Sequence, residues 1–513
     1  MHAYFRIRFL LLGCLLLMSG LGAQASHVLG GDLDYAYIPG SASQYRITAR
    51  LYSNPADAGT NFPDPRIMFL SGTQNGCAST SASNFQLQVP RLQLMRRALG
   101  CAVNGRSYNI SQYEATVTLL PGQWTLKVIE ELRSGGMLNL NTTDTEGFYM
   151  TAYLDNSSGL TNNSPRFTSF ALPYVCGSQP YRYSFSTFEP NGDSLVYRSV
   201  QPLSATITNQ GCGTAIAYAS YAAGQFQDPI TGQTATYPAG QFTAGFPVLS
   251  FRAINGVAVP QFELNAANGD LQTTPVAARG LNTVVVQVDE YRRVNGTWAR
   301  IGSVMRDVVY SVFDANGNRN PSFSSLQIAG ANQPLNQPIV VQRGQSIALT
   351  LTAADPDAGQ AVQISSDVAS VIPGASFQRQ GTSQAVLSWQ VPATLPLGCY
   401  SFTVTVMDDN CPNSGSEVRT INFLVSAQAL GIARSRAQVL STYPMPFRSQ
   451  VQFRLPTPGV QPVYITDGLG RLMATLQSRP DGSVNWAPAA EVPAGAYFAR
   501  PGSGEAVFRL LRE

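Results

Sequence analysis

The chain of 513 residues contains only two histidines, and Lys127 is its one lysine. His2 falls in the N-terminal leader described below, so the processed chain keeps only His27, next to its new start. Ser-His-Asp and Cys-His mechanisms need an imidazole held in place by packing, and histidine-rich zinc sites need several. A single lysine leaves little scope for Schiff-base catalysis. These shortages exclude most nucleophilic and zinc-dependent chemistry and leave hydrolases that use two carboxyl groups.

Charge is also scarce, since charged residues make up 12% of the chain and the formal net charge is +3. The basic residues are scattered along the sequence and form no cluster. We therefore expect no nucleic-acid partner and no patch for anionic membranes. After the leader, no segment has 18 or more consecutive apolar residues, so we expect no transmembrane segment in the mature chain.

The N-terminus has the features of a secretory signal peptide. Arg6 and Arg8 form a short basic region, an apolar stretch follows over residues 9–21, and Ala23-Gln24-Ala25 is a small-x-small cleavage site. This order predicts a signal peptide over residues 1–25, with cleavage between Ala25 and Ser26.

Removal of the leader leaves six cysteines, an even number that predicts disulfides in an exported chain. They are Cys77, Cys101, Cys176, Cys212, Cys399 and Cys411. Sequence alone allows 15 pairings of six cysteines. Because the cysteines fall as three neighbouring couples, the hypothesis is pairing within each couple: Cys77–Cys101, Cys176–Cys212 and Cys399–Cys411.

The hydrophobic pattern is that of β-strands. Tyr45, Ile47, Ala49 and Leu51 alternate with polar residues, and similar stretches recur between turns rich in Gly, Pro, Asn and Asp. Period-two alternation with frequent turns predicts an all-β protein built of β-sandwiches. The tryptophans within such stretches (Trp124, Trp298 and Trp389) are predicted core residues.

A weak internal repeat divides the chain. Two segments each begin after an Asn-rich linker, at Pro165-Arg166-Phe167 and at Pro321-Ser322-Phe323. Each then has an acidic turn (residues 189–193 or 355–359) and a late alternating strand that reaches an acid, Glu290 or Asp408. The predicted parts are a signal peptide (1–25), an N-terminal β-domain (26–165), two immunoglobulin-like sandwiches (166–315 and 316–427), a linker (428–437) and a C-terminal domain (438–513).

The acidic turn of the second repeat suggests calcium. Asp355 and Asp357, with Asp408 or Asp409, offer hard oxygen ligands that could meet at one end of a sandwich. The alternative is that Asp-Pro-Asp-x-Gly is only a turn, with Asp capping the backbone and Gly adopting positive φ. In the first repeat Glu189 and Asn191 replace the two aspartates, which weakens the prediction of calcium there.

These repeats resemble the cadherin-like modules of bacterial surface proteins. The start of the mature chain (residues 26–33), Asn163-Ser164-Pro165 and residues 192–197 resemble large surface proteins of gliding and related Bacteroidetes, as does Glu290-Tyr291-Arg292 followed by Arg306-Asp307. Those relatives are often longer and have a different, gliding-associated tail that this sequence lacks.

The C-terminal region resembles the type A sorting domain of the type IX secretion system of Bacteroidetes. The matching positions are Tyr443, Pro444, Pro446, Asp467, Gly470, Arg471, Gly495 and Tyr497. The family usually has Asn where Met445 stands. The resemblance implies a small C-terminal β-sandwich, export by the type IX secretion machinery through the periplasm, and release or attachment to surface lipopolysaccharide.

The sequence thus favours a secreted or cell-surface protein that is not an enzyme, with an adhesin-like or structural role toward extracellular glycans, matrix or cells. No cofactor is expected apart from the candidate Ca²⁺. The alternative is a secreted glycan-processing enzyme or a carbohydrate-binding accessory protein. For that alternative, Glu130-Glu131 and Glu290 are acids to consider, and acids clustered in an open cleft with exposed tyrosines would favour it.

Overall fold

Two compact units make up the chain, Met1–Ala429 and Leu430–Glu513. The computed structural model describes residues 28–512 apart from 56–61, 63, 73–84, 100–105, 142–145, 207–208, 277–278, 428–445, 456–457, 468–470 and 503–507. Regular structure in the described residues is β-strand except for one short helix, α2 (Val368–Val371). The predicted all-β fold class is confirmed.

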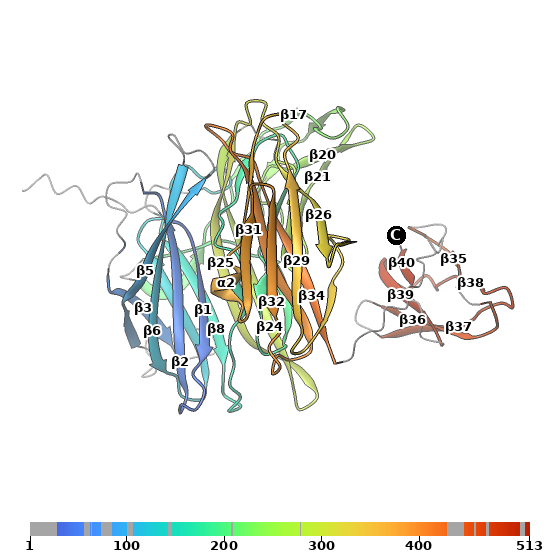
Figure 1. The fold of residues 1–513 in the computed structure, drawn as a ribbon, viewed down its shortest axis with the longest axis horizontal. Helices are drawn as coiled ribbons and strands as arrows, with labels where there is room; N and C mark the ends of the chain where they lie inside the picture. The colour runs from blue at the N-terminus through green and yellow to red at the C-terminus, as the bar shows by residue number, and fades with distance from the viewer. Residues whose placement is uncertain are drawn as a thin grey trace, which may run out of the picture. The chain divides into compact units, whose positions relative to one another are not determined.

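The N-terminal strands form most of one large sheet (blue to cyan in Figure 1). They are β1 (Val28–Tyr37), β2 (Gln44–Ser53), β3 (Arg66–Ser71), β4 (Phe85–Val89), β5 (Arg91–Leu99), β6 (Arg106–Thr118), β7 (Gln123–Glu130) and β8 (Phe148–Asp155). The order along the sheet is β4-β3-β7-β8-β25-β1-β2-β6-β5, so a strand from much later in the chain lies between β8 and β1.

The first immunoglobulin-like module follows the N-terminal strands. Its strands are β9 (Arg166–Phe167), β10 (Tyr174–Cys176), β11 (Tyr181–Ser184), β12 (Thr187–Phe188), β13 (Ser194–Ser199), β22 (Phe262–Leu264), β23 (Asp270–Thr273), β24 (Gly280–Val294) and β25 (Thr297–Phe313). One layer has the order β11-β23-β22, and the other contains β13-β24-β25 with β10 parallel to β25. This is the division into B-E-D and C-F-G strands that defines the immunoglobulin fold.

Between β13 and β22 the chain makes an excursion of short hairpins. Its strands are β14 (Leu203–Thr206), β15 (Asn209–Ala215), β16 (Ser220–Tyr221), β17 (Gly224–Gln227), β18 (Thr234–Tyr237), β19 (Gly240–Gln241), β20 (Phe251–Ile254) and β21 (Val257–Pro260). β14 pairs with β8 through Leu203 and Tyr149, which connects the excursion to the large sheet.

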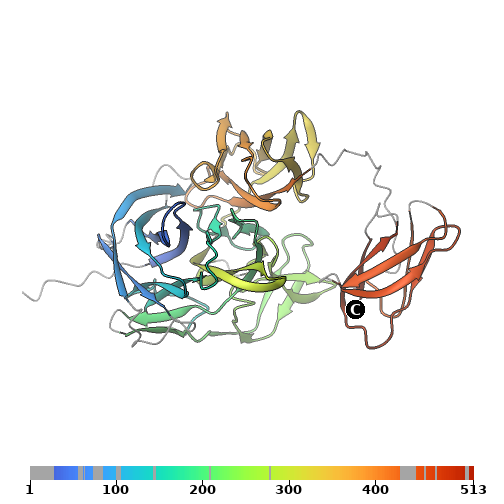
Figure 2. The same ribbon diagram turned by 90° about the horizontal axis from the view of Figure 1, so that it is seen from below.

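The second module has two separate sheets, seen in yellow and orange in Figure 2. Its strands are β26 (Ser322–Ile328), β27 (Ala331–Gln333), β28 (Ile339–Gln342), β29 (Ser346–Ala354), β30 (Val362–Ser365), β31 (Ala375–Gln380), β32 (Gln384–Gln390), β33 (Gly398–Asp408) and β34 (Ser416–Ser426). The orders β27-β26-β29-β32-β31 and β28-β34-β33-β30, with β28 parallel to β34, repeat the pattern of the first module. The internal repeat in the sequence is therefore present as a repeated strand order.

The predicted boundary at residue 165 needs correction, because the large sheet crosses it. β25 pairs with β1 over Gly30–Asp32 and with β8 over Ala152–Leu154. The N-terminal strands and the C-F-G layer of the first module therefore share continuous backbone hydrogen bonding. The segments 26–165 and 166–315 have no separate sheets at this junction.

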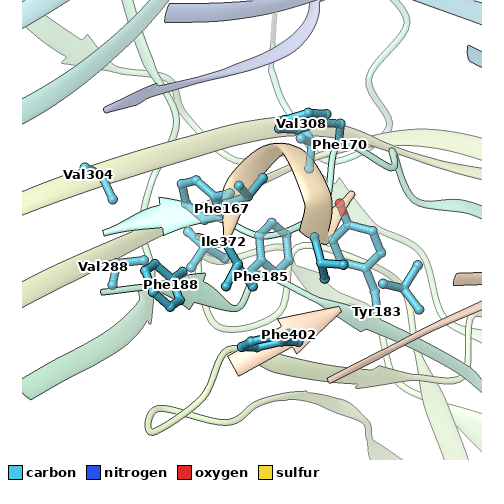
Figure 3. Packing of buried hydrophobic residues seen from close by; sticks show 14 of the residues in the cluster. Phe167, Phe170, Tyr183, Phe185, Phe188, Val288, Val304, Val308, Ile372 and Phe402 are labelled. Carbon is cyan, nitrogen blue, oxygen red and sulfur yellow. The ribbon is translucent and has the colours of Figure 1, made fainter. Parts of the chain in front are cut away.

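Apolar side chains join the first and second modules in one core. Phe167, Phe185 and Phe188 of the first module pack in the same cluster as Ile372 and Phe402 of the second (Figure 3). The ring centroids of Phe188 and Tyr400 are 5.4 Å apart. Burial of side chains of this size is the main source of stability in such an interface.

The unit Leu430–Glu513 has its own core. Its described strands are β35 (Val451–Arg454), β36 (Pro462–Asp467), β37 (Leu472–Gln477), β38 (Ser483–Trp486), β39 (Gly495–Pro501) and β40 (Phe508–Arg512), in the sheets β35-β38 and β37-β36-β39-β40. Trp486 packs between Phe447 and Tyr497, with ring centroids 5.5 and 5.1 Å away.

Candidate functional site

Each immunoglobulin-like module has a carboxylate centre at the same place in its strand order. The acidic turn lies before the C strand, which is β13 in the first module and β30 in the second. The late acid is on the F strand, as Glu290 on β24 or Asp408 at the end of β33. In each module the acidic turn and the F-strand acid are about 50 to 100 positions apart in sequence. The shared strand order explains why they lie at the same end of the module.

In the first module, Glu189, Asp193 and Glu290 form the centre. One carboxylate oxygen from each lies within 4.8 Å of those of the other two. No other group of three acidic, histidine or cysteine side chains meets this criterion among the described residues. Glu189 is held by its own turn, because its two oxygens accept hydrogen bonds from the backbone N–H groups of Asn191 (2.7 Å) and Asp193 (2.6 Å).

The linker before the first module closes this centre. Asn162 Nδ2 donates to Glu290 Oε2 (2.6 Å), and Asn162 Oδ1 accepts from Arg292 (2.7 Å). Arg292 also binds both oxygens of Asp193, at 2.7 and 2.5 Å. Glu290 Oε1 is buried and has no hydrogen-bond partner among the described residues. Three carboxylates thus face one guanidinium.

This crowding disfavours ionisation of two of the acids. Burial raises the pKa of Glu189 to about 7. Burial, followed by the charges of Glu189 and Asp193, raises the pKa of Glu290 well above its usual range. Such a centre can be neutralised by a retained proton or by a cation that replaces it.

Gly302 on β25 makes the close approach to Glu290 possible. A Cβ at position 302 would lie 2.3 Å from Glu290 Oε2 and 2.6 Å from the Tyr35 hydroxyl oxygen. Tyr35 comes from β1, so the N-terminal strands contribute to the wall of this centre. The site therefore lies where the N-terminal strands, the linker and the first module meet.

In the second module, the structure separates the roles of the four predicted calcium ligands. Both oxygens of Asp357 accept from Arg319, through its backbone N–H and its Nε (each 2.7 Å). Asp409 Oδ1 accepts from the Ala361 N–H (2.9 Å). Asp357 and Asp409 are thus engaged by residues distant in sequence. The turn itself has the features of the alternative, since Asp355 Oδ1 accepts from the Asp357 N–H (2.7 Å) and Gly359 has a φ of 88°.

Asp408 is engaged by the backbone as well, since its Oδ1 accepts from the Asn410 N–H (3.0 Å) and its Oδ2 from the Gly415 N–H (2.8 Å). Asp408 Oδ2 accepts from Asn318 Nδ2 (2.9 Å), and Gln360 Nε2 donates to Asn318 Oδ1 (2.9 Å). Burial raises the pKa of Asp408 to about 6, and the charge of Asp355 contributes in the same direction. Three buried oxygens have no donor among the described residues: Asp355 Oδ2, Gln360 Oε1 and Asn413 Oδ1. Unpaired carboxylate and amide oxygens are the ligand types that Ca²⁺ prefers.

Sequence reasoning identified Asp355, Asp408, Glu189 and Glu290, but missed the linker asparagines. Asn162 and Asn318 each stand three residues before the proline that begins a module. Each donates its amide N–H to the F-strand acid of that module. This repeated Asn-x-x-Pro spacing is the signal that would have revealed them.

Two of the acids named for the enzymatic alternative, Glu130 and Glu290, have structural contacts, whereas Glu131 is exposed just after β7. Glu130 on β7 pairs with Arg66 on β3, and both side chains are buried. Glu290 has none of its surface exposed. A hydrolase of polymeric glycans needs two facing carboxyls that a chain can reach, about 5–10 Å apart. In the three-acid centre the carboxylate oxygens are closer than this, and Glu290 is fully buried, whereas Glu189 and Asp193 line a cavity of ≈ 530 Å³.

Two of the three predicted disulfides are wrong, because Cys176 and Cys399 are free thiols. Cys399 is at the start of β33, and Cys411 follows its end. A strand advances about 3.3 Å per residue, so the nine residues from 399 to 408 separate them by about 30 Å, whereas a disulfide needs Cα atoms within about 7 Å. Cys411 is disulfide-bonded, so its partner is not Cys399.

Cys176 lies beside Phe313 on β25, whereas strand β15, which contains position 212, pairs with β14. The different strand partners explain the failure of the Cys176–Cys212 hypothesis. Cys77, Cys101 and the side chain of Cys212 lie outside the described residues, so the first predicted pair stays a prediction.

Of the three tryptophans predicted to lie in the core, two are buried and one is exposed. Trp389 and Trp124 are buried, at 1% and 7% exposure. Trp298 is 55% exposed, and Arg293 lies over its ring at 5.2 Å, so its assignment to the core is wrong. It is near the tip of the β24–β25 hairpin, where strand alternation continues beyond the sheet that could cover it.

Several residues of the sorting resemblance have structural roles in the C-terminal unit. Asp467 accepts from the backbone N–H (2.9 Å) and Nε (2.6 Å) of Arg471. The Tyr497 hydroxyl donates to the Pro493 carbonyl (2.6 Å), and Gly495 has a φ of 155°. Pro446 is described and precedes the buried Phe447. Tyr443, Pro444, Gly470, Ala25 and Ser26 lie outside the described residues.

No family model matches the sequence, and no curated protein matches it significantly. Solved structures with similar parts include Drosophila OTK extracellular domains 3–5, at 9% identity, covering 68% of this chain and 97% of that one with a TM-score of 0.13. The BSP domain of a biofilm associated protein has 9% identity, covering 96% and 98% with a TM-score of 0.13. Scores this low carry no argument, and the immunoglobulin-like assignment rests on the strand orders given above.

The described residues contain no helix that is both long and apolar enough to span a bilayer.

Proposed function

We propose that the protein is an exported, non-enzymatic component of the cell surface or the medium, with an adhesin-like or structural role. The acidic centres support this proposal. Each connects a linker asparagine, an acidic turn and an F-strand acid within the fold. These hydrogen bonds are the observation that carries the proposal, because they give the acids a structural role in connecting parts of the fold. Disulfide and sandwich architecture suit a protein that works outside the cell.

The proposed export route is the type IX secretion system, with its machinery as the first partner. The compact C-terminal unit supports this route, because Tyr497 of the sorting resemblance lies in its core and Asp467 binds Arg471 within it. Release into the medium and attachment to surface lipopolysaccharide are the two fates implied by the family.

The export proposal is tested in a host that has this secretion system. Intact-mass analysis compares the full chain with a variant that lacks residues 430–513, in the periplasm, cell-surface and medium fractions. We expect a product that begins at Ser26 and ends near residue 430, on the surface or in the medium, from the full chain alone. A periplasmic product that retains Arg512 would contradict the proposal, as would export of the truncated chain.

Calcium is proposed as a structural ion in the second module, at Asp355 and Asp408 with the amide oxygen of Gln360. The unpartnered oxygens of Asp355, Gln360 and Asn413 support it. An ion there would connect the Asn318 linker to the F strand and stiffen the join between the two modules.

The geometry supports the two forms of the alternative function, a glycan-processing enzyme and a carbohydrate-binding protein, to different degrees. The carboxylates of the three-acid centre are closer together than a glycan hydrolase needs and give it no support, whereas a carbohydrate-binding role is supported by a polar groove between the two modules.

A further inference from the structure

A polar groove runs between the first and second modules. Two cavities of ≈ 480 and ≈ 380 Å³ adjoin each other, since Arg182, Gln272 and Arg419 are in the walls of both. The smaller shares Asn265, Asn268 and Asn422 with a third cavity of ≈ 530 Å³, whose wall also contains Glu189 and Asp193 of the three-acid centre. Cavities of this size fit ligands of one to a few rings each. The adjoining cavities suit an extended ligand.

Strand alternation places the groove residues. On β11, Tyr181 and Tyr183 are buried in the core while Arg182 between them is exposed. Gln272 on β23 is directly opposite Arg182 in the antiparallel register, so the two side chains share the outward face. Arg419 comes from β34 of the second module. The groove is thus built from regular strands of both modules, which hold its donors in fixed positions.

The ≈ 480 Å³ cavity at one end of the groove has more guanidinium than carboxylate groups. Arg182 and Arg419 both approach Glu417 Oε1, at 3.9 and 2.9 Å. The other oxygen of Glu417 accepts from the Phe323 N–H (2.9 Å). Arg252 lines the same cavity, with its Nε on the buried Asp228 (2.6 Å). The three guanidinium groups of this cavity therefore have two carboxylate partners, Glu417 in the cavity wall and Asp228 behind it.

The neighbouring ≈ 380 Å³ cavity has amide and acidic side chains in its wall in addition to the shared arginines. Its walls include Asn265, Asn422 and Gln272, whose amides can both donate to and accept from hydroxyl groups. Two acids, Glu263 and Asp270, also line it. Asp270 is half-buried and accepts from Asn268 (3.0 Å) and from Thr420. A second anionic group would be disfavoured here, whereas uncharged sugar hydroxyls would be accepted.

We infer that this groove binds an acidic oligosaccharide, with one carboxylate or sulfate seated among Arg182, Arg252 and Arg419 and neutral sugar extending along the amide-lined part. Guanidinium groups bind carboxylate and sulfate oxygens with paired N–H donors. The Arg182 side chain is 47% exposed, so the ligand can reach it from solvent. The inference rests on the proposed extracellular function and names the chemical class of its partner.

Binding is measured by calorimetry with the mature chain, residues 26–513, at 150 mM salt. The probes each carry at most one anionic group: 3′-sialyllactose has one carboxylate on a neutral disaccharide, 3′-sulfolactose has one sulfate, and the chitin trisaccharide is uncharged. We expect one or both acidic probes to bind and the chitin probe to bind at least tenfold more weakly. The acidic probe that binds more tightly shows whether carboxylate or sulfate is preferred.

Arg182→Gln is the test variant, because Glu417 keeps its contact with Arg419 when the charge at 182 is removed. We expect it to weaken binding at least tenfold, with Arg182→Lys intermediate because it keeps the charge and loses the paired donors. Arg279→Gln is the matched control. Arg279 is a 79% exposed side chain that lies 3.7 Å from Asp314 and is not part of the groove.

Thermal unfolding of each variant shows whether the fold is retained. Equal losses in the Arg182 and Arg279 variants would overturn the inference, because they would indicate nonspecific charge attraction. Failure of both acidic probes to bind would overturn it too, as would equal binding of the chitin probe. These results leave the export proposal intact, since export is measured separately in cells by mass and location.

Discussion

At the residue scale, the buried acids of the first module make stability depend on pH. Burial raises the pKa of Glu189 to about 7 and that of Glu290 well above its usual range. A glutamate in an unfolded chain has a pKa of about 4.3. The folded protein therefore binds more protons than the unfolded chain above that pH. The stability from these groups is full below it and is lost as pH rises through about 7 and beyond.

Glu290→Gln is expected to reduce this loss. The amide oxygen can still accept from Asn162, while one negative charge beside Glu189 and Asp193 is removed. We expect a higher melting temperature than the wild type at pH 8, by a few degrees, and a smaller difference at pH 5. Thermal unfolding from pH 5 to 8 in chelator measures this. Glu263→Gln, at an exposed strand position, is the control. A lower melting temperature at pH 8 would contradict the prediction.

The two free cysteines should differ in reactivity. Cys176 is buried, and burial raises the pKa of its thiol to about 11, so little thiolate forms at neutral pH. Cys399 is exposed. We expect a maleimide to label Cys399 in the native protein and Cys176 only after unfolding, as measured by peptide mapping without reductant. A native peptide that joins Cys399 to Cys411 would contradict the structure.

At the scale of strands, the second module depends on one tryptophan. Trp389 on β32 contacts Phe402 and Phe423 across the sandwich, with ring centroids 4.7 and 5.1 Å away. Trp389→Ala is expected to lower the free energy of unfolding by about 3–5 kcal/mol, as for large aromatic residues in cores. Trp298→Ala should cost about 1 kcal/mol or less, since it loses an exposed contact with Arg293. Urea unfolding compares them, and equal losses would contradict the burial pattern.

Local pattern predicted the strands and the repeated modules, but it could not predict how the sheets join. β25 is buried along most of its length and pairs with β1, β8, β10 and β24. Its sequence shows no simple apolar run, because Arg306 and Asp307 lie in its middle. The structure explains them, since Asp307 binds Arg133 at 2.9 and 2.6 Å and Arg306 donates to the Ser169 carbonyl (2.5 Å). Such long-range partners leave no periodic signal.

The same limit applies to the candidate sites. The acidic turns were visible because turn chemistry is local, and the F-strand acids because they interrupt alternation. The contacts of Asn162 and Asn318 depend on where each linker crosses the end of its module. Cysteine pairing failed for a related reason, because proximity in sequence means separation in space when an extended strand lies between two residues.

At the scale of the whole molecule, calcium should stabilise the unit that contains both modules. An ion that binds only the folded state adds about 2.7 kcal/mol when its concentration is 100 times Kd. We therefore expect millimolar Ca²⁺, added after dialysis against chelator, to raise the melting temperature by several degrees. Mg²⁺ should have a smaller effect, because it needs a tighter octahedral shell than these amide oxygens provide.

Two substitutions assign the ion to a site. Asp355→Asn keeps Oδ1 as the acceptor for the Asp357 N–H (2.7 Å) and replaces the unpartnered Oδ2 by an amide, so the fold should survive. We expect it to abolish the calcium-dependent shift, while Glu290→Gln preserves it. The opposite result would place the ion in the first module, where three carboxylates and one arginine leave two negative charges. No shift in the wild type would reject calcium at both centres and leave protons and linker asparagines to neutralise them.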